Sequence, residues 1–209
     1  MLELEGAIIT IDAMGCQKAI AEKIVEKGAD YVLAVKENQA HLLDDIKEAF
    51  THIPQAIQHT TTEKGHGRIE KRTCSVITDM NWITKLDKWK NLQSIISIQT
   101  QRTITQSGET QTEQRFYITS LRTTPEHFSQ IIRAHWSIEN NLHWCLDVVF
   151  KEDYSTKQAG NAAENFSMIN KAALSILKNN KKNKSSLKRK RLKCGWSNEY
   201  LETLLYKEF

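Results

Sequence analysis

Residues 7–35 read AIITIDAMGCQKAIAEKIVEKGADYVLAV, and this stretch decides the fold class. The apolar runs 7–11 and 31–35 are short and nearly continuous, as expected of strands that are covered on both faces. Between them, residues 17–27 carry apolar side chains at helical spacing, and Gly28 suits the C-terminal end of a helix. Strand, helix and strand in this order predict a parallel α/β unit.

The same pattern continues for a short distance and then changes. Asn38 can cap a further helix at about 39–50, which extends the alternation of strands and helices. Residues 51–122 lose the helical periodicity and gain β-branched residues, which predicts an antiparallel, β-rich insertion. Its candidate strands are 72–78, 94–104 and 115–121. The motif GHGR at 65–68 precedes them, and the sequence assigns no role to His66, Gly67 and Arg68.

Helical patterning returns at about 124–147, where Thr123 or Thr124 can provide the N-cap. A second helix is expected at about 161–178, and a short one from Ser197. The predicted organisation is a first part of an α/β core at 1–50, the insertion at 51–122, a second part of the core at 123–178, and a basic segment with a C-terminal helix at 179–209.

The composition is that of an ordinary folded protein. Of the 209 residues, 40% are hydrophobic and 26% are charged, which argues against disorder. The apolar runs are much shorter than the roughly 20 residues of a membrane-spanning helix, so no membrane partner is expected. The N-terminus carries acids where a signal peptide needs positive charge, and the four cysteines form no C-x-x-C pair. A cytoplasmic location is expected.

Positive charge is concentrated near the C-terminus. Between Lys178 and Lys193 there are nine Lys and Arg and no acid, whereas the other residues hold 20 bases and 25 acids. Such a run suits an anionic polymer, and nucleic acid is the first candidate, although a solvated tail or linker explains the run equally well. The candidate DNA-binding residues of this run are Lys188, Arg189, Lys190 and Arg191.

Two carboxylates stand out by their positions. Asp12 follows the first strand, and open α/β sheets place reacting groups at the carboxyl ends of parallel strands. Glu139 lies in the middle of the apolar stripe of its helix, where burial without a partner costs several kcal/mol. Each has a plainer explanation: Asp12 simply ends a strand, and Glu139 forms a buried ion pair with Arg133 or a histidine. His135 and His143 lie on one face of the same helix, so a histidine metal site is conceivable, but core or phosphate-contacting histidines are commoner.

Three stretches in a fixed order carry a resemblance to a known family. They are GAIITIDAMGCQKAIAEKIVEKGADYVLAVKENQ (6–39), GHGRIEKR (65–72) and RAHWSIENNLHWCLDVVFKED (133–153). Together they resemble bacterial insertion-sequence transposases of the H-repeat-associated (ISAs-type) group, within the DDE class. The resemblance implies an RNase H-like core with a β-rich insertion and C-terminal helices.

The resemblance also implies a chemistry: cleavage and strand transfer of DNA by three carboxylates that hold two divalent cations, Mg²⁺ or Mn²⁺. It places the second catalytic Asp on Asp12 and the catalytic Glu on Glu139, both as metal ligands, so we expect the two to approach each other. The implied partners are double-stranded DNA, at element ends and target, and full-length transposase or a second copy of this chain. The implied location is the bacterial nucleoid.

Two departures from the family pattern follow. Related transposases carry a Tyr, an Arg and a Lys around the catalytic Glu, and these positions hold Ile132, His135 and Leu146 in this chain. His135 and Arg133 are nevertheless expected to contact DNA. The family's first catalytic Asp belongs upstream of the Asp12 strand, where this sequence begins, so the sequence predicts a truncated copy with a partial core.

Three functions are therefore possible: a DDE recombinase, a non-catalytic DNA-binding module that modulates a full-length transposase, and a product without function. The missing first Asp favours the second and third possibilities over the first.

Overall fold

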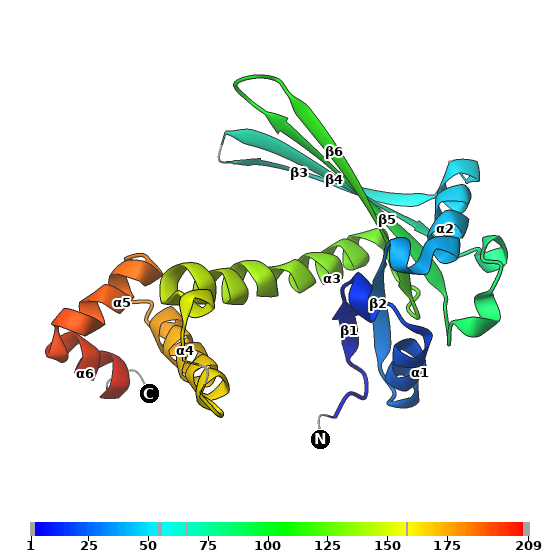
Figure 1. Ribbon diagram of the computed structural model, residues 1–209. Helices are drawn as coiled ribbons and strands as arrows, with labels where there is room; N and C mark the ends of the chain where they lie inside the picture. The colour runs from blue at the N-terminus through cyan, green and yellow to red at the C-terminus, as the bar shows by residue number, and fades with distance from the viewer. Residues whose placement is uncertain (1–2, 54–55, 66, 158, 207–209) are drawn as a thin grey trace. The chain divides into compact units, whose positions relative to one another are not determined.

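A computed structural model describes residues 3–53, 56–65, 67–157 and 159–206, except for the side chains of residues 138–140. The contacts within the chain separate two compact units, residues 1–135 and 136–209 (Figure 1). Each unit has an apolar core of its own. In the described part of the chain, no helix has the length and apolar character that crossing a membrane requires.

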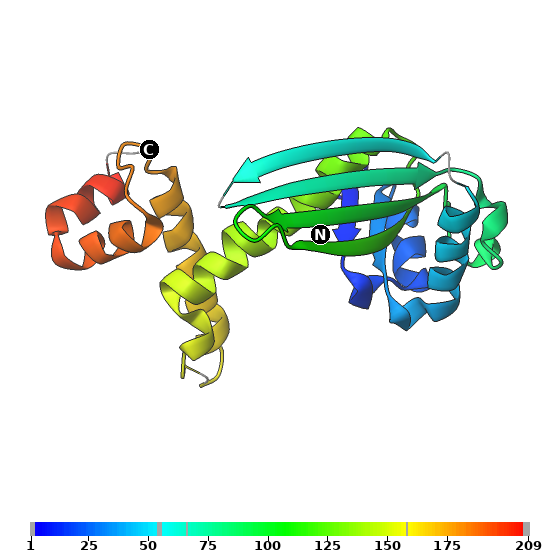
Figure 2. The same ribbon diagram turned by 90° about the horizontal axis from the view of Figure 1, so that it is seen from above.

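A mixed six-stranded sheet forms the framework of the first unit, with the strand order β1-β2-β6-β5-β4-β3 (Figures 1 and 2). The two N-terminal strands run parallel to each other, and all other neighbours are antiparallel. The strands are β1 (Ile8–Ile11), β2 (Asp30–Val35), β3 (Ile57–Gly65), β4 (Arg68–Ile77), β5 (Ser94–Ile104) and β6 (Thr110–Thr119). The β-rich segment therefore extends the sheet of the α/β unit and does not form a separate sheet.

Two helices cover one face of this sheet. The helix α1 (Lys18–Glu26) connects β1 to β2, and Gly28 at φ +70° reverses the chain after it, as the sequence predicts. The helix α2 (Ala40–His52) follows β2. Their apolar faces pack on alternate residues of the strands, and the largest fully buried side chains of this core are Tyr31, Leu33, Ile46, Ile95 and Ile118.

The prediction that Asn38 is the N-cap of α2 is wrong, because a short 3-10 turn (Glu37–Gln39) precedes the helix. Gln39 takes the N-cap position and makes no capping hydrogen bond with its side chain. The Asn38 amide instead donates to the carbonyl oxygen of Ala13 at 2.7 Å, which ties this turn to the segment after β1.

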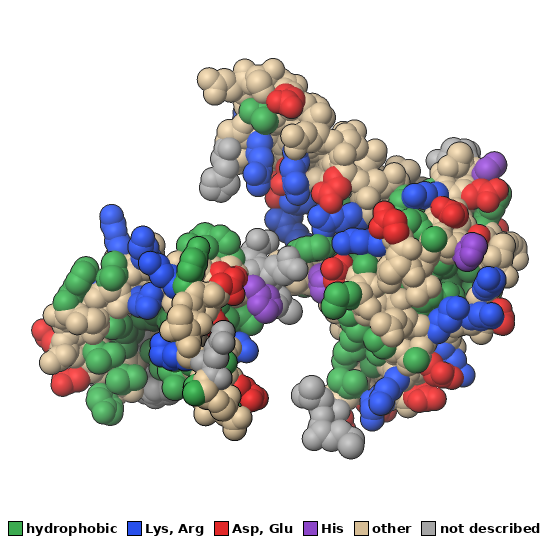
Figure 3. Space-filling model, in the orientation of Figure 1, with side chains coloured by type: hydrophobic (Ala, Val, Ile, Leu, Met, Phe, Trp, Pro, Cys, Tyr) green, Lys and Arg blue, Asp and Glu red, His purple; other side chains and the backbone are tan. Residues whose placement is uncertain are grey.

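The far halves of β3 to β6 project beyond the helices as a sheet arm with polar faces (Figures 1 and 2). On one face, hydroxyl groups pair across strands, as between Thr103 and Thr110 at 2.8 Å. The other face carries arginines and glutamates, and Figure 3 shows Lys and Arg side chains gathered along the underside of the arm. Of the sequence motif GHGR, Gly65 ends β3, Arg68 begins β4 and Gly67 has a φ of +72°, whereas His66 lies outside the described residues.

The opposite face of the sheet is covered by α3 (Pro125–Ile138), whose last three residues lie beyond the unit boundary. The backbone N–H of His127 donates to the Thr124 hydroxyl at 3.3 Å, so Thr124 caps the helix as one of the two predicted candidates. Phe128 and Ile132, one turn apart, are buried beneath the helix.

The second unit consists of helical segments. Two π-helical segments, Glu139–His143 and Leu146–Phe150, precede a 3-10 turn at Glu152–Tyr154. The helix predicted at 124–147 therefore continues beyond residue 138, but largely with π-helical geometry. Three α-helices follow: α4 (Ala162–Asn179), α5 (Leu187–Trp196) and α6 (Asn198–Tyr206). Their shared core contains Leu146, Val149, Leu174, Leu177 and Leu204.

Candidate active site

Asp12 lies at the carboxyl end of β1, where the sequence predicts a reacting group. It immediately precedes a 3-10 turn, Ala13–Gly15, and its backbone is extended. The Asn38 amide that binds the carbonyl of Ala13 comes from the segment after β2. The segment that follows β2 therefore holds the backbone next to Asp12.

One carboxylate oxygen of Asp12 lacks a hydrogen-bond donor. The side chain as a whole is 49% exposed, but its Oδ1 atom is shielded from solvent and accepts no hydrogen bond from any residue of the described chain. The nearest cation is Lys36 Nζ at 3.8 Å, which is too far for a hydrogen bond. Because shielded polar atoms normally have a partner, this oxygen is suited to a hard divalent cation such as Mg²⁺.

The helix α3 brings His135 to the strand that ends at Asp12. His135 Nδ1 lies 3.0 Å from the hydroxyl oxygen of Thr10, two residues before the carboxylate. Successive side chains of a strand point to opposite faces, so Thr10 lies on the face opposite Ile9 and Ile11, which pack in the core under α1 and α2. His135 thus occupies the α3 side of the sheet, close to the carboxyl end of β1.

Arg133, two residues earlier on α3, is paired with the sheet arm. Its guanidinium binds both carboxylate oxygens of Glu63 on β3, at 2.5 and 3.0 Å. The hydrogen bond from Arg133 is the main reason that the pKa of Glu63 lies below its usual value, and Arg72 lowers it further. The described partner of Arg133 is thus Glu63, and the Arg133 side chain remains 58% exposed.

Glu139 begins the π-helical segment that follows α3, four residues after His135. Its side chain lies outside the described residues, so its role as a metal ligand and its approach to Asp12 stay predictions. Among the side chains that the structure describes, no three His, Cys, Asp or Glu gather as a metal site.

The family model for the transposase DDE domain matches residues 1–176 of this chain. The chain belongs to the transposase DDE domain family. The "H repeat-associated putative transposase YhhI" of Escherichia coli K12 is 42% identical over 98% of this chain, and the "Putative transposase YncI" of Escherichia coli O157:H7 is 39% identical over 98%. The resemblance drawn from the three sequence stretches is thereby confirmed. The chain spans about half of each relative, 56% and 54% of their lengths.

The basic run lies beyond the matched DDE domain, and its second half lies in α5, where the four candidate DNA contacts separate into two kinds. Lys188 and Arg189 are exposed. Lys190 is only 6% exposed, and its ammonium donates to the carbonyl oxygens of Leu177 at 3.2 Å and Asn180 at 2.5 Å. Lys190 thus supplies hydrogen-bond donors to carbonyl groups at the C-terminal end of α4.

Arg191 also contacts other residues of the second unit. Its guanidinium donates to the carbonyl oxygen of Val149 and lies over the ring of Phe150, 5.1 Å from the ring centre. A spacing signal for Lys190 was present in the sequence, because Leu187, Lys190 and Cys194 fall on one helical face and the two apolar members pack on the core. Lys36 and Thr10 beside Asp12 gave no such signal.

Proposed function

We propose that this chain serves the cleavage and joining of DNA strands at the ends of a mobile element, through an RNase H-like DDE core. Asp12 and Glu139 are the proposed metal ligands. The observation that supports this most strongly is the shielded Oδ1 of Asp12, which has no hydrogen-bond donor at the carboxyl end of a parallel strand. In the proposed site, Mg²⁺ or Mn²⁺ supplies activation of the attacking hydroxyl and stabilisation of the leaving oxygen.

The neighbouring residues have defined tasks in this proposal. Lys36, 3.8 Å from Asp12, is close enough to offset negative charge but too far to occupy the oxygen. His135 is held by Thr10 and replaces the arginine of related enzymes as a contact for a DNA phosphate. Arg133 is held by Glu63 and keeps more than half of its side chain exposed, so it can present further N–H donors to the same backbone.

The resemblance places two of the three family carboxylates on this chain. We therefore propose that Asp12 and Glu139 hold a cation weakly, and that a complete two-metal site requires a further acid. The test is a strand-transfer assay on element-end DNA with Mg²⁺. It compares the chain alone with the chain supplemented by the part of YhhI that this chain does not span.

Activity only in the supplemented reaction, abolished by Asp12→Asn and by Glu139→Gln, is the expected result. Asp87→Asn, which changes an exposed acid in the loop between β4 and β5, is the control and should leave the activity unchanged. Activity of the chain alone would show that a local acid completes the site. Activity that survives Asp12→Asn would refute the assignment of the carboxylates.

A second candidate function is a non-catalytic DNA-binding module that modulates a full-length transposase. The exposed Lys188 and Arg189 on α5, outside the matched DDE domain, support it. If the supplemented reaction stays inactive while the chain binds duplex DNA and lowers the activity of added YhhI, this second function is favoured.

A further inference from the structure

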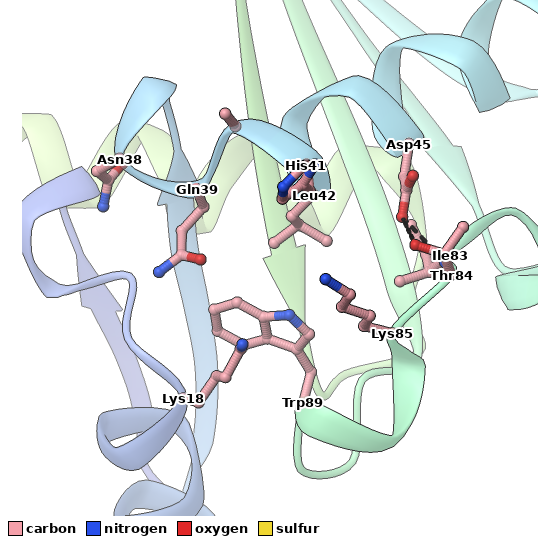
Figure 4. A pocket seen from close by; sticks show the side chains of 11 residues that line it. Lys18, Asn38, Gln39, His41, Leu42, Asp45, Ile83, Thr84, Lys85 and Trp89 are labelled. Carbon is pink, nitrogen blue, oxygen red and sulfur yellow. Dashed lines mark hydrogen bonds between the residues drawn. The ribbon is translucent and has the colours of Figure 1, made fainter.

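A cavity of about 160 Å³ lies on the face of the sheet that α1 and α2 cover (Figure 4). Its walls come from three parts of the first unit: the start of α1, the turn and first residues of α2, and the loop between β4 and β5. The first two parts follow β1 and β2, so the cavity opens near the carboxyl ends of the parallel strands. That edge is where open α/β sheets place ligands.

The floor of the cavity is the indole of Trp89, and its N–H has no partner. Trp89 is only 3% exposed, yet no residue of the described chain accepts a hydrogen bond from its Nε1. Figure 4 shows this nitrogen turned into the space beside Lys85 and Leu42. Trp89 Nε1 is not among the polar atoms shielded from solvent, so it is open to the cavity and can donate to an acceptor placed there.

Two lysines approach the same ring. Figure 4 shows the side chains of Lys18 and Lys85 reaching toward Trp89 from opposite sides of the cavity. Neither ammonium lies within ion-pair distance of a carboxylate in the part of the chain that the structure describes. His41, on the first turn of α2, adds another ring nitrogen to the wall.

The single carboxylate of the wall, that of Asp45, is already engaged. Its Oδ2 accepts hydrogen bonds from the backbone N–H and the hydroxyl of Thr84, both at 2.9 Å. These bonds fasten the loop between β4 and β5 to α2 and so hold the cavity open in its present form. Asp45 keeps its charge, but the wall holds two lysine ammonium groups against this one carboxylate, so the matching ligand is an acceptor with negative charge.

The first turn of α2 adds to this preference. Its N-cap residue, Gln39, makes no capping bond and donates instead to the carbonyl of Cys16 at 2.9 Å. The N-terminal end of a helix favours an anion because its backbone N–H groups and its dipole carry partial positive charge. This effect is secondary to the two lysines and the indole N–H.

We propose that this cavity binds a phosphate group, held by the ammonium groups of Lys18 and Lys85 and by the indole N–H of Trp89. The molecule that carries this phosphate would be a DNA strand, and this part of the proposal alone rests on the DNA function proposed above. The phosphate would then lie on the same edge of the sheet as Asp12. A terminal phosphate, a backbone phosphodiester and free phosphate share this chemistry, so the experiment separates them.

The test follows the indole N–H resonance of Trp89 by NMR in the chain of 209 residues, assigned by its loss in Trp89→Phe. Three probes are titrated: inorganic phosphate, a short oligonucleotide with a 5′-phosphate, and the same oligonucleotide without it. Lys18→Gln and Lys85→Gln are the site variants, and Lys88→Gln, an exposed lysine of the same loop outside the cavity wall, is the control.

The proposal predicts a saturable shift of the Trp89 resonance with at least one probe. Each site variant should weaken that binding by about tenfold or more, since a charge-assisted hydrogen bond is lost, and Lys88→Gln should leave it unchanged. Preference for the oligonucleotide with the 5′-phosphate would indicate that the cavity binds the end of a strand. Equal binding of both oligonucleotides would indicate a backbone phosphate. Binding of inorganic phosphate alone would indicate a free anion.

No shift with any probe, or equal weakening by Lys88→Gln, would overturn the proposal. The outcome is independent of the catalytic proposal, because the strand-transfer assay reports on Asp12 and Glu139 whether or not this cavity binds phosphate.

Discussion

Lys190 offers a sharp test of the division within the basic run, because the structure gives it a different role from its neighbours. It is buried, and its ammonium donates to two carbonyl oxygens at the C-terminal end of α4. Lys190→Ala leaves both carbonyls without this donor and opens a gap beside Leu177. Lys188→Ala, two residues earlier in α5, removes only an exposed side chain.

The expected loss follows from the two hydrogen bonds. A hydrogen bond from a charged donor contributes roughly 1.5–3 kcal/mol, but removal of the ammonium also removes the cost of burying it. We therefore expect Lys190→Ala to lower the free energy of unfolding of the second unit by about 2–4 kcal/mol. Lys188→Ala should change it by less than about 0.5 kcal/mol. Lys190→Met, which keeps the apolar stem, should recover only part of the loss.

Hydrogen exchange of backbone amides in α4 and α5 is the appropriate assay, because the chain has two units and a single unfolding midpoint would mix them. The predicted result is loss of protection in α4 and α5 for Lys190→Ala, with the first unit unchanged. Equal protection in the Lys190→Ala and Lys188→Ala variants would refute the structural role of Lys190.

Three further predictions concern other parts of the chain. Replacement of both Lys188 and Arg189 by Ala should reduce the slope of log K against log salt concentration for duplex DNA by up to about 2, whereas an unchanged slope would place the DNA surface elsewhere. Glu63 has a lowered pKa in the folded chain, so its contribution to stability is present above the pKa of the unfolded state and is lost as the pH falls through the folded value. Glu63→Gln should thus destabilise the first unit slightly at pH 7 and not near pH 2, in thermal melts followed by NMR resonances of that unit, and an equal effect at both pH values would contradict this. Burial raises the pKa of the Cys16 and Cys74 thiols to about 12, so iodoacetamide at pH 8 should alkylate Cys194 first, as read by peptide mass spectrometry. Equal rates at the three thiols would contradict the burial.

The sequence predicted the elements whose pattern is local. The apolar runs that became β1 and β2, and Gly28 after α1, were recognisable because burial on both faces and a positive φ leave direct marks in the sequence. β3 was not predicted, because its residues are mostly exposed and polar and it lies at the edge of the sheet beside β4. The π-helical turns after residue 138 were not predicted either, since residues 139–150 contain no Pro or Gly to mark a change.

One residue of the candidate site could likewise be predicted from the sequence, whereas the contacts around it could not. Asp12 was identified from its place at a strand end, which is a local property. The contact of His135 with Thr10 joins residues 125 positions apart, and the cavity around Trp89 is assembled from three separate segments. Such contacts depend on how the elements pack, so a single sequence gives no indication of them.

Fe²⁺-directed backbone cleavage tests whether Asp12 and Glu139 hold the same divalent cation, as proposed. Fe²⁺ replaces Mg²⁺, and ascorbate with peroxide generates radicals that cut the chain beside the bound ion. If both residues hold the ion, cuts are expected near residues 12 and 139, Mg²⁺ should suppress them, and both should disappear together in either Asp12→Asn or Glu139→Gln. Cuts near one residue that persist when the other is replaced, or cuts unaffected by Asp12→Asn, would contradict it.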